Sequence, residues 1–315
     1  MQNNLDLNSI QLHLTEHMKK LSIATNGPED YKGYQFMPGF GFEATKYAYD
    51  EWNIPENSVF VSSFPKTGTA WCMEIVKQIL YGRDEKLLDM YLAVPMPMFL
   101  LEMSFPGKFD VFDKLPHSTK VFATHLPVEL FNYEKMRRSN SKMIYVMRNP
   151  KDQAVSWFHF SKKIPLPDET KKQMGEEWNK FFHNYVNGQH PQCNKEGQWY
   201  PDHIKEWMKY KNDENFLVVV YEDMKTNFQS EIRRIAKFLD VDLGHNDVAN
   251  VAEVCSIKSM KEQADVEKTG FLKINVRKGE IGGWKNQFTV AQSELMDKLI
   301  KEQLGDTGIE FTYEI

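Results

Sequence analysis

The sequence predicts an α/β fold: a single domain with a central parallel β-sheet flanked by helices. Four short runs are apolar at every position, which is typical of strands buried on both faces of a parallel sheet. These runs are Val59–Val61, Val121–Ala123, Met143–Met147 and Phe216–Val220. Helical patterns separate them, and the 315 residues contain no internal repeat, low-complexity tract or linker. A chain of this length forms one domain in many α/β proteins.

The composition is that of a globular protein, with 41% hydrophobic and 26% charged residues. The formal net charge of -5 argues against nucleic acid as a partner, so an anionic ligand requires locally placed Lys and Arg. Three cysteines without CxxC spacing favour a reducing compartment. The segment Met1–Leu21 lacks the apolar core of a leader, and no stretch has the ~20 apolar residues of a membrane span. We therefore expect a cytoplasmic protein.

The first apolar run leads into a loop that is P-loop-like. Residues Ser62–Trp71 open a helix whose apolar positions have spacing i, i+3, i+4, i+7, i+8: Cys72, Ile75, Val76, Ile79 and Leu80. Free backbone N–H groups and the helix dipole then favour a phosphate or sulfate. A Walker A loop places its Lys after the second Gly, whereas Lys66 precedes the only Gly here. A plain turn between strand and helix is the alternative.

The later helices follow from the same periodicity. One helix is expected over about 226–239, burying Phe228, Ile232, Ile235 and Leu239, and another over about 291–304. The segment 164–197 is rich in Pro, Lys, Glu, Asn and Gln, and is expected to contain loops and a helix covering one edge of the sheet. Residues 1–50 are expected to form an N-terminal extension packing on the domain.

A second anion site is expected where the run Met143–Met147 ends. Arg148 follows directly, Asn149 is a good N-cap and Pro150 is favoured at the first helical position. Ligands bind at this edge of open parallel sheets. An Arg fork suits phosphate, and Ser156 adds a hydroxyl two turns later. Pairing of Arg148 with an acidic neighbour is the alternative.

Two further features lie near these loops. Arg277 and Lys278 stand in a glycine-rich segment, Val276–Lys285, that reads as a solvated turn by itself. Together with the other two loops, it indicates a ligand with more than one anionic group. His125 follows the run Val121–Ala123 and is either structural or a general base. His13–His17 matches HxxEH, but a charged helical turn explains it and no metal is assigned.

The order of these motifs resembles the cytosolic sulfotransferase family over about residues 57–304. The segment Phe64–Trp71 is similar to the family's Tyr-Pro-Lys-Ser-Gly-Thr-Thr-Trp loop, and Ala123–Pro127 to its Lys-Thr-His-Leu-Pro element. Arg148–Ser156 reproduces the 3′-phosphate segment. Tyr221–Met224 and Arg277–Gly279 also match.

The resemblance implies metal-free transfer of a sulfuryl group from 3′-phosphoadenosine 5′-phosphosulfate (PAPS) to a hydroxyl or amine of a small lipophilic acceptor, leaving 3′-phosphoadenosine 5′-phosphate (PAP). The implied catalytic residues are His125 as base, Lys66 on the leaving oxygen, and Ser156. The implied nucleotide-binding residues are Lys66, Thr67, Gly68, Thr69, Ala70, Trp71, Arg148, Ser156, Tyr221, Ser256, Ile257, Arg277, Lys278 and Gly279.

The resemblance also implies an acceptor site and a dimer. Apolar residues expected to line the acceptor site are Met98, Phe99, Phe105 and Phe160, although ordinary core is the favoured interpretation for any one of them taken singly. A Lys-x3-Thr-Val-x3-Glu motif implies a homodimer through Lys285, Thr289, Val290 and Glu294.

Three positions depart from the family pattern: Ala123 replaces a Lys, Ala70 replaces a Thr and Ile257 replaces an aromatic residue.

Two competing hypotheses remain at this point. A nucleotide kinase requires a magnesium carboxylate at a strand end, where this chain has Arg148. A nucleotide-binding scaffold without chemistry is motivated by Ala123 and Ile257, while the presence of His125 and Lys66 argues against it.

Overall fold

A four-stranded parallel sheet forms the centre of the molecule in a computed structural model that describes residues 29–36, 42–92, 94, 96–103, 105–164, 168–190, 194–266 and 278–315. The strand order is β4-β3-β5-β6. Their bounds are β3 Val59–Ser63, β4 Val121–Thr124, β5 Lys142–Met147 and β6 Phe216–Val220. Val61 pairs with Ala123 on one side and Ile144 on the other. The predicted α/β fold and parallel sheet are confirmed, and all four strands present their carboxyl ends at one edge.

A small antiparallel hairpin lies outside this sheet and was not predicted. It consists of β1 (Glu29–Tyr31) and β2 (Tyr34–Phe36), joined through Lys32 and Gly33 with φ of 55° and 77°. Two successive positive φ values are typical of a type I′ hairpin turn. Strands of three residues carry too few positions for a periodic signal, which is why the sequence did not reveal them.

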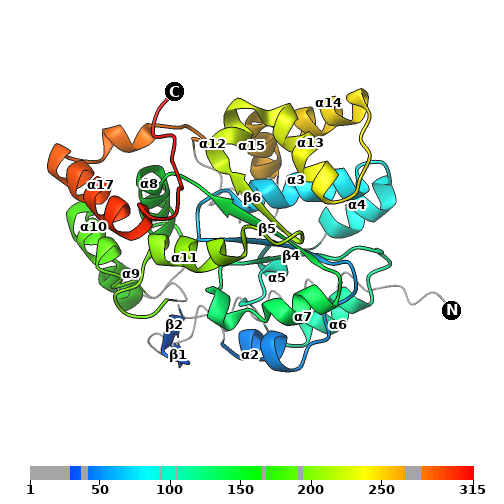
Figure 1. The fold of residues 1–315 in the computed structure, drawn as a ribbon, viewed down its shortest axis with the longest axis horizontal. Coiled ribbons are helices and arrows are strands. Elements are labelled where there is room, and N and C mark those ends of the chain that lie inside the picture. Colours follow the sequence, from blue (N-terminus) through cyan, green and yellow to red (C-terminus); the bar gives the residue numbers. More distant parts are fainter. Residues whose placement is uncertain are drawn as a thin grey trace.

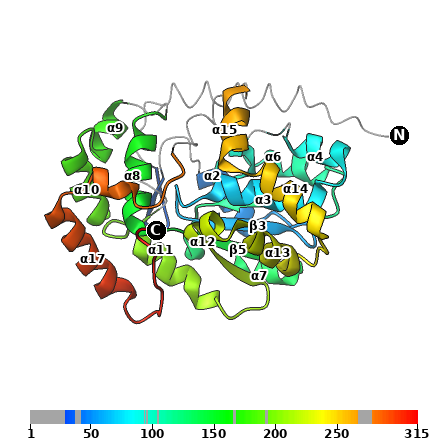
Figure 2. The same cartoon turned by 90° about the horizontal axis from the view of Figure 1, so that it is seen from above.

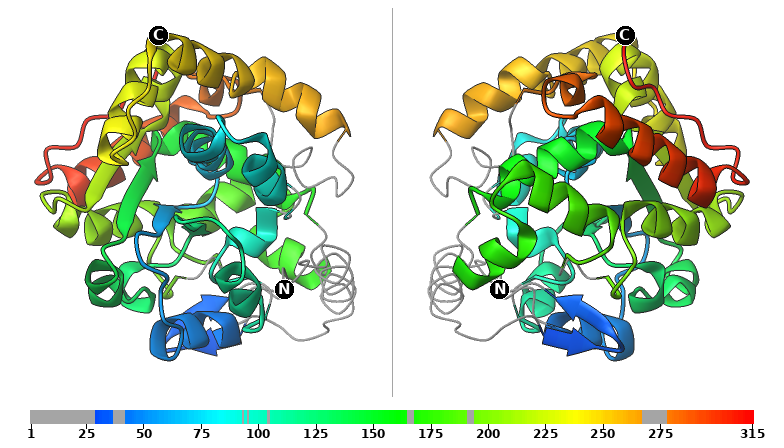
Figure 3. Two further views of the ribbon diagram at one scale, coloured as in Figure 1. Left: turned by 90° about the vertical axis from the view of Figure 1, so that its right-hand side faces the viewer. Right: turned by 90° about the vertical axis from the view of Figure 1, so that its left-hand side faces the viewer.

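Helices cover both faces of the sheet (Figure 1). One face carries α3 (Thr69–Tyr81) and α13 (Phe228–Phe238), at the top in Figure 1, and the opposite face carries α2 (Phe42–Asp50) and α7 (Tyr133–Arg138). The side views in Figure 3 show the same layers. The remaining short elements near these layers are α4 Glu85–Leu92, α5 Met96–Phe99, α6 Lys108–Asp113, η1 Val128–Leu130, η2 Met208–Tyr210, α12 Tyr221–Thr226, α14 His245–Val254 and α15 Ile257–Val266.

A further group of helices stands at the end of the sheet where β5 leads into α8 (Figure 2). It contains α8 Pro150–Ser161, α9 Asp168–Met174, α10 Trp178–Val186, α11 Tyr200–Trp207, η3 Gly283–Asn286 and α17 Val290–Leu304. The described part of segment 164–197 thus holds two helices rather than one, and α10 packs on α8. α13 lies within its predicted range, and α17 begins one residue earlier than expected.

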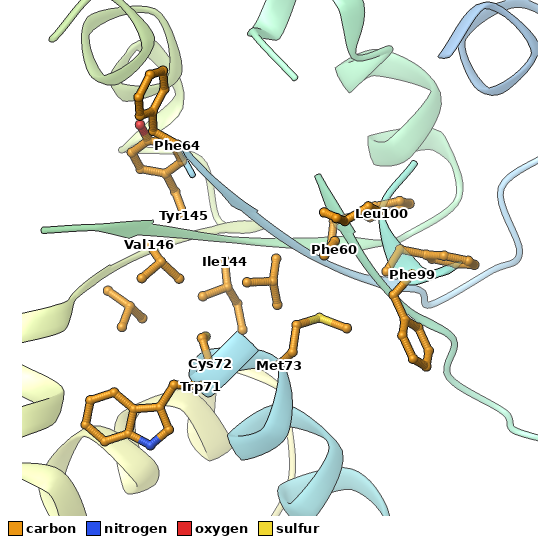
Figure 4. Close-up of a cluster of buried hydrophobic side chains, with 14 of the residues drawn as sticks. Phe60, Phe64, Trp71, Cys72, Met73, Phe99, Leu100, Ile144, Tyr145 and Val146 are labelled. Carbon is orange, nitrogen blue, oxygen red and sulfur yellow. The ribbon is translucent and has the colours of Figure 1, made fainter. Parts of the chain in front are cut away.

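Buried side chains lock α3 against the sheet (Figure 4). Cys72 of α3 and Ile144 and Val146 of β5 lie on one side of the sheet, each 0% exposed, while Tyr145 points to the other side toward Phe64. Burial of each large apolar side chain contributes about 1.5–3 kcal/mol. The first turn of α3 is therefore held in a fixed position relative to the end of β3.

Candidate active site

The loop between β3 and α3 has positive φ angles, which are unfavourable for most residue types. Lys66 and Gly68 have φ of 69° and 114°. A Cβ at Gly68 would lie 2.8 Å from Cδ2 of Tyr221, so a side chain at this position would collide with the ring. The Thr67 hydroxyl donates to the carbonyl oxygens of Phe64 (2.9 Å) and Val146 (3.1 Å). These contacts fix the loop above the first turn of α3.

The N-terminus of α3 is arranged to receive an anion. Gly68 occupies the N-cap, and no side chain of the described residues caps the helix. The first backbone N–H groups of a helix lack partners within the helix, and its dipole favours negative charge there. Gln153 of α8 donates from Nε2 to the carbonyl oxygen of Pro65 (2.7 Å), which ties the loop to a second helix. The loop therefore has the geometry of a phosphate or sulfate cradle.

His125 lies directly after β4, beside this loop. Its Nδ1 is 2.8 Å from the carbonyl oxygen of Ser63. Because a carbonyl only accepts, Nδ1 carries the proton and Nε2 keeps its lone pair. Burial lowers the pKa of His125, while the Glu102 carboxylate and the Ser63 carbonyl oppose this shift and the Lys66 charge adds to it. The imidazole is thus neutral at neutral pH and suited to accept a proton at Nε2.

The Lys66 ammonium is held over an aromatic ring. Its Nζ lies 4.2 Å from the centroid of the Phe160 ring, in α8. A cation in this position is attracted by the ring face. The charge of Lys66 also lowers the pKa of His125, so the two groups interact electrostatically. Base, ammonium and α3 N-terminus therefore belong to one site.

Arg148 is a buried cation with unused hydrogen-bonding capacity. It follows β5 and is 6% exposed. Its Nη2 donates to the carbonyl oxygen of Glu280 (3.0 Å), and its Cζ lies 4.2 Å from the centroid of the Tyr221 ring. Among the described residues, Nε of Arg148 has no hydrogen-bond partner. A buried unpaired donor on a cation is costly, and an anionic ligand would satisfy it.

The first turn of α8 holds the C-terminal loop beside Arg148. Asn149 caps α8 by accepting from the Asp152 N–H at 2.8 Å, and Pro150 opens the helix, as predicted. The fully buried Asp152 carboxylate accepts from the N–H groups of Gly282 (2.8 Å) and Trp284 (2.9 Å). Ser156, 7% exposed, lies further along the same helix.

The same loop reaches the start of α15. Gly279 has φ of 69°, and a Cβ there would lie 3.1 Å from Cγ2 of Ile257. Ser256, directly before Ile257, accepts from the N–H of Ser259 at 3.1 Å. Lys278 is exposed, with Nζ 3.9 Å from a Glu280 carboxylate oxygen. The structure thus brings together segments 148–156, 256–257 and 278–284; Arg277 lies outside the described residues.

Trp71 sits in an aromatic group at the start of α3. Its Nε1 donates to the carbonyl oxygen of Cys255 (2.8 Å). Tyr221 packs edge-on at 5.4 Å between ring centroids, and Phe228 is tilted at 5.2 Å. Flat aromatic surfaces of this kind suit a purine base.

The four residues expected at the acceptor site divide into two pairs. Met98 and Phe99 are 1% and 0% exposed, and the Phe99 ring lies 5.6 Å from Tyr91 and 5.3 Å from Phe112. Their packing agrees with the alternative interpretation, ordinary core. Phe105 and Phe160 are partly exposed, so they remain suited to contact a ligand.

Within the described ranges, no group of three or more His, Cys, Asp or Glu residues is arranged to hold a metal ion. The HxxEH segment His13–His17 lies outside them. Among the helices described, none is both long and apolar enough to cross a membrane.

The family model of the sulfotransferase domain matches residues 56–308. The chain belongs to the sulfotransferase family. It is 32% identical over 283 residues to dog sulfotransferase 1B1, covering 84% of this chain and 90% of the relative. It is 30% identical to rabbit amine sulfotransferase, covering 84% and 87%. The resemblance inferred from the motifs is therefore confirmed.

Solved structures agree. The structure of mouse sulfotransferase SULT7A1 complexed with PAP superposes with a TM-score of 0.73 at 28% identity, covering 90% of this chain and 95% of that one. A central parallel sheet flanked by helices is thus the sulfotransferase fold. This chain is a sulfotransferase of that architecture.

Several residues around the site of this sulfotransferase were not identified from the sequence. Glu102, Gln153 and Tyr200 each fix backbone at the site, the last by bonding the N–H of Arg148 at 2.8 Å. Glu102 was detectable in principle, because it is a lone carboxylate inside an apolar stretch that begins at Met96. Gln153 and Tyr200 carry no such signal, since both residue types are common on helix surfaces.

Proposed function

We propose that this sulfotransferase moves a sulfuryl group from PAPS to the hydroxyl or amine of a small lipophilic acceptor, with His125 as base. The observation that carries the proposal is the tautomer of His125, whose proton on Nδ1 points to the Ser63 carbonyl at 2.8 Å. The loop that follows Ser63 contains Lys66 and leads into α3, so His125 is held beside this loop with Nε2 as the ring atom that can accept a proton. PAPS, when bound, supplies the sulfuryl group and a 5′-phosphate leaving group.

The residues present fit a nucleotide with phosphates at both ends. The N–H groups of Thr67–Trp71 and the hydroxyl of Thr69 suit the 5′-phosphate. Arg148, with its unpaired buried Nε, suits the 3′-phosphate, together with Ser156 and the loop at Lys278 and Gly279. Arg277 is assigned to the same phosphate. The adenine is assigned to Trp71, Tyr221, Ser256 and Ile257.

The neutral imidazole of His125 and the positive charge of Lys66 suit these two residues to different catalytic roles. His125 Nε2 takes the proton of the acceptor as its oxygen or nitrogen attacks sulfur, which contributes about 10²–10⁴-fold. Lys66 stabilises negative charge on the oxygen that leaves with the phosphate. Ser156 is proposed as a further group contacting the nucleotide from α8. Rigid placement of both substrates supplies much of the remaining acceleration.

Incubation with ³⁵S-labelled PAPS and a panel of phenols, sterols, aliphatic alcohols and arylamines tests the proposal. We expect labelled organic sulfate or sulfamate from at least one class, at a rate that His125→Ala reduces at least 100-fold. Melting temperature raised by ATP with magnesium but not by PAP would instead favour a kinase. PAP binding without any transferred label would favour the scaffold without chemistry.

A homodimer through Lys285, Thr289, Val290 and Glu294 belongs to the same proposal. Val290 is 75% exposed at the start of α17, and Thr289 caps this helix by accepting from the Gln292 N–H at 3.2 Å. An exposed apolar residue on an ordered helix turn suits a small contact between copies. Light scattering is expected to give twice the chain mass, and Val290→Glu to shift it toward the monomer.

Location and domain organisation are inferred in the same way. Cys72 and Cys255 are buried and unbridged, which suits the cytoplasm. We assign residues 1–50 to an extension that packs on the domain, supported by the bond from Asn132 Nδ2 to the Tyr49 carbonyl at 3.2 Å. Cell fractionation and limited proteolysis test these two assignments.

A further inference from the structure

A buried carboxylate lies behind His125. Glu102, in the turn between α5 and α6, is 0% exposed. Its Oε1 accepts from the backbone N–H of His125 at 2.7 Å, and its Oε2 accepts from the Thr124 hydroxyl at 3.0 Å. The Thr124 oxygen in turn accepts from the N–H of Leu126 at 3.0 Å. One carboxylate therefore fixes three consecutive residues, with His125 in the middle.

The turn that carries Glu102 is itself held by a buried ammonium. Lys108 is 1% exposed, and its Nζ donates to the carbonyl oxygens of Leu100, Leu101 (3.1 Å) and Met103. Burial lowers the pKa of Lys108 to about 7, although the charge of Glu102 opposes this shift. The two groups thus interact while each is bonded to backbone. The turn is also joined to β4, since the N–H of Leu101 donates to the Ala123 carbonyl at 2.9 Å.

His125 is held on its other sides as well. Nδ1 bonds to the Ser63 carbonyl at 2.8 Å, and the carbonyl of Leu126 accepts from Trp207 Nε1 (3.1 Å) and faces His203 Nε2 (3.2 Å). Among the described residues, two charged groups act on the pKa of His125: the Glu102 carboxylate raises it and the Lys66 ammonium lowers it. His203 stays neutral, because burial lowers its pKa to about 3.

We propose that Glu102 is a positioning residue for sulfuryl transfer, holding the His125 backbone so that Nε2 points at the acceptor. The proposal rests on the proposed function, in which His125 is the base. Glu102 does not touch the reacting atoms in this account; it acts through His125. Its negative charge also favours the imidazolium that forms when His125 takes the acceptor proton.

Glu102→Gln tests the proposal with little change in shape. Gln keeps an oxygen that accepts from the His125 N–H, and it removes the charge. We expect kcat to fall about 10- to 100-fold, because the imidazolium formed on proton transfer loses its stabilising charge and the Gln NH₂ group cannot accept from the Thr124 hydroxyl. The PAP dissociation constant should stay within about threefold, since the hydrogen bonds of Glu102 to described residues go to Thr124 and His125, neither of which is assigned to the nucleotide. Glu129→Gln is the matched control, because Glu129 lies four residues after His125 and pairs with Lys195 at the surface.

The pH profile separates positioning from general weakening of the fold. Glu102 raises the pKa of His125, so its removal lowers that pKa further. The acid limb of kcat/KM, and the His125 ¹⁵N titration by NMR, should both shift to lower pH in Glu102→Gln and not in Glu129→Gln. A purely structural role would reduce melting temperature without this shift.

The possible results distinguish failure of the proposed function from failure of the positioning role of Glu102. A wild-type protein that transfers no sulfuryl group overturns the proposed function, whereas an active wild type matched by Glu102→Gln in kcat and acid limb overturns only the positioning role. Loss of kcat together with PAP affinity also overturns it. If Glu102→Gln fails to fold, Thr124→Val replaces it: this variant leaves the charge in place, so kcat should fall with the acid limb unmoved, and an unchanged kcat overturns the proposal.

Discussion

The guanidinium of Arg148 donates a hydrogen bond to the carbonyl oxygen of Glu280 at 3.0 Å, although 132 residues separate them in the chain. This contact joins the end of β5 to the loop that carries Lys278 and Gly279. Asp152 reinforces the junction through the N–H groups of Gly282 and Trp284. The segments around Arg148 and around Lys278, which the sequence indicated as separate anion sites, therefore lie against each other.

Arg148→Gln should weaken PAP binding about 10- to 150-fold, because hydrogen bonds to charged groups are each worth about 1.5–3 kcal/mol. Isothermal titration calorimetry measures the change. Arg137→Gln is the control, since this guanidinium is exposed and pairs with Glu134. A dissociation constant within threefold of wild type in Arg148→Gln would remove Arg148 from the phosphate site.

Gly68→Ala should reduce both stability and PAP affinity. Its φ of 114° disfavours any side chain, and the new Cβ would lie 2.8 Å from the Tyr221 ring. Gly33→Ala is the matched control, because Gly33 has φ of 77° but its nearest neighbouring atom is 4.0 Å away. We expect thermal shifts in both variants and a weaker PAP titration in Gly68→Ala alone. Equal PAP affinities in the two variants would contradict a cradle at this loop.

The rate should depend on pH through His125. Burial lowers the pKa of His125, so kcat/KM should rise with pH through a midpoint below the ordinary 6.5 and then stay level. Lys66 contributes to this shift, so Lys66→Met should move the ¹⁵N titration of His125 to higher pH. A midpoint at or above 6.5 in the wild type would show that His125 is not the buried neutral base described here.

Stability should fall in mild acid, partly through His203. Burial lowers the pKa of His203 to about 3, so below pH 6.5 the unfolded chain binds a proton that the native state excludes. This difference costs up to about 1.4 kcal/mol per pH unit. His203→Gln should remove that share of the slope, as measured by urea unfolding at pH 7 and pH 5.5. An identical slope in wild type and variant would contradict it.

The sheet was predictable because its strands are short apolar runs separated by helical patterns. Runs such as Met143–Met147 are short and apolar at every position, which is typical of a strand covered on both faces. The N-cap at Asn149 was equally predictable, since helix capping depends on residues close in sequence. Fold and family followed from these local features.

The supporting groups were not predictable, because their roles depend on contacts between distant segments. Glu102 meets His125 only because the β4 edge and the turn after α5 lie side by side, and Gln153 reaches Pro65 across 88 residues. The same limit applies to Phe99, whose sequence context suits either core or ligand. Strand order and helix packing decide such cases, and neither can be inferred from the pattern of neighbouring residues in the sequence.

The central claim is that His125 and Lys66 act on the same transferring group, and that His125 does so without being required for nucleotide binding. Rapid-quench single-turnover transfer from ³⁵S-labelled PAPS, with PAP affinity measured in parallel, tests it most directly. We expect His125→Ala to slow transfer about 10²–10⁴-fold and Lys66→Ala about 10²–10³-fold, while His245→Ala and Lys114→Ala behave as wild type. His125→Ala should retain wild-type PAP affinity. Single-turnover rates within a few-fold of wild type in either active-site variant would contradict the account.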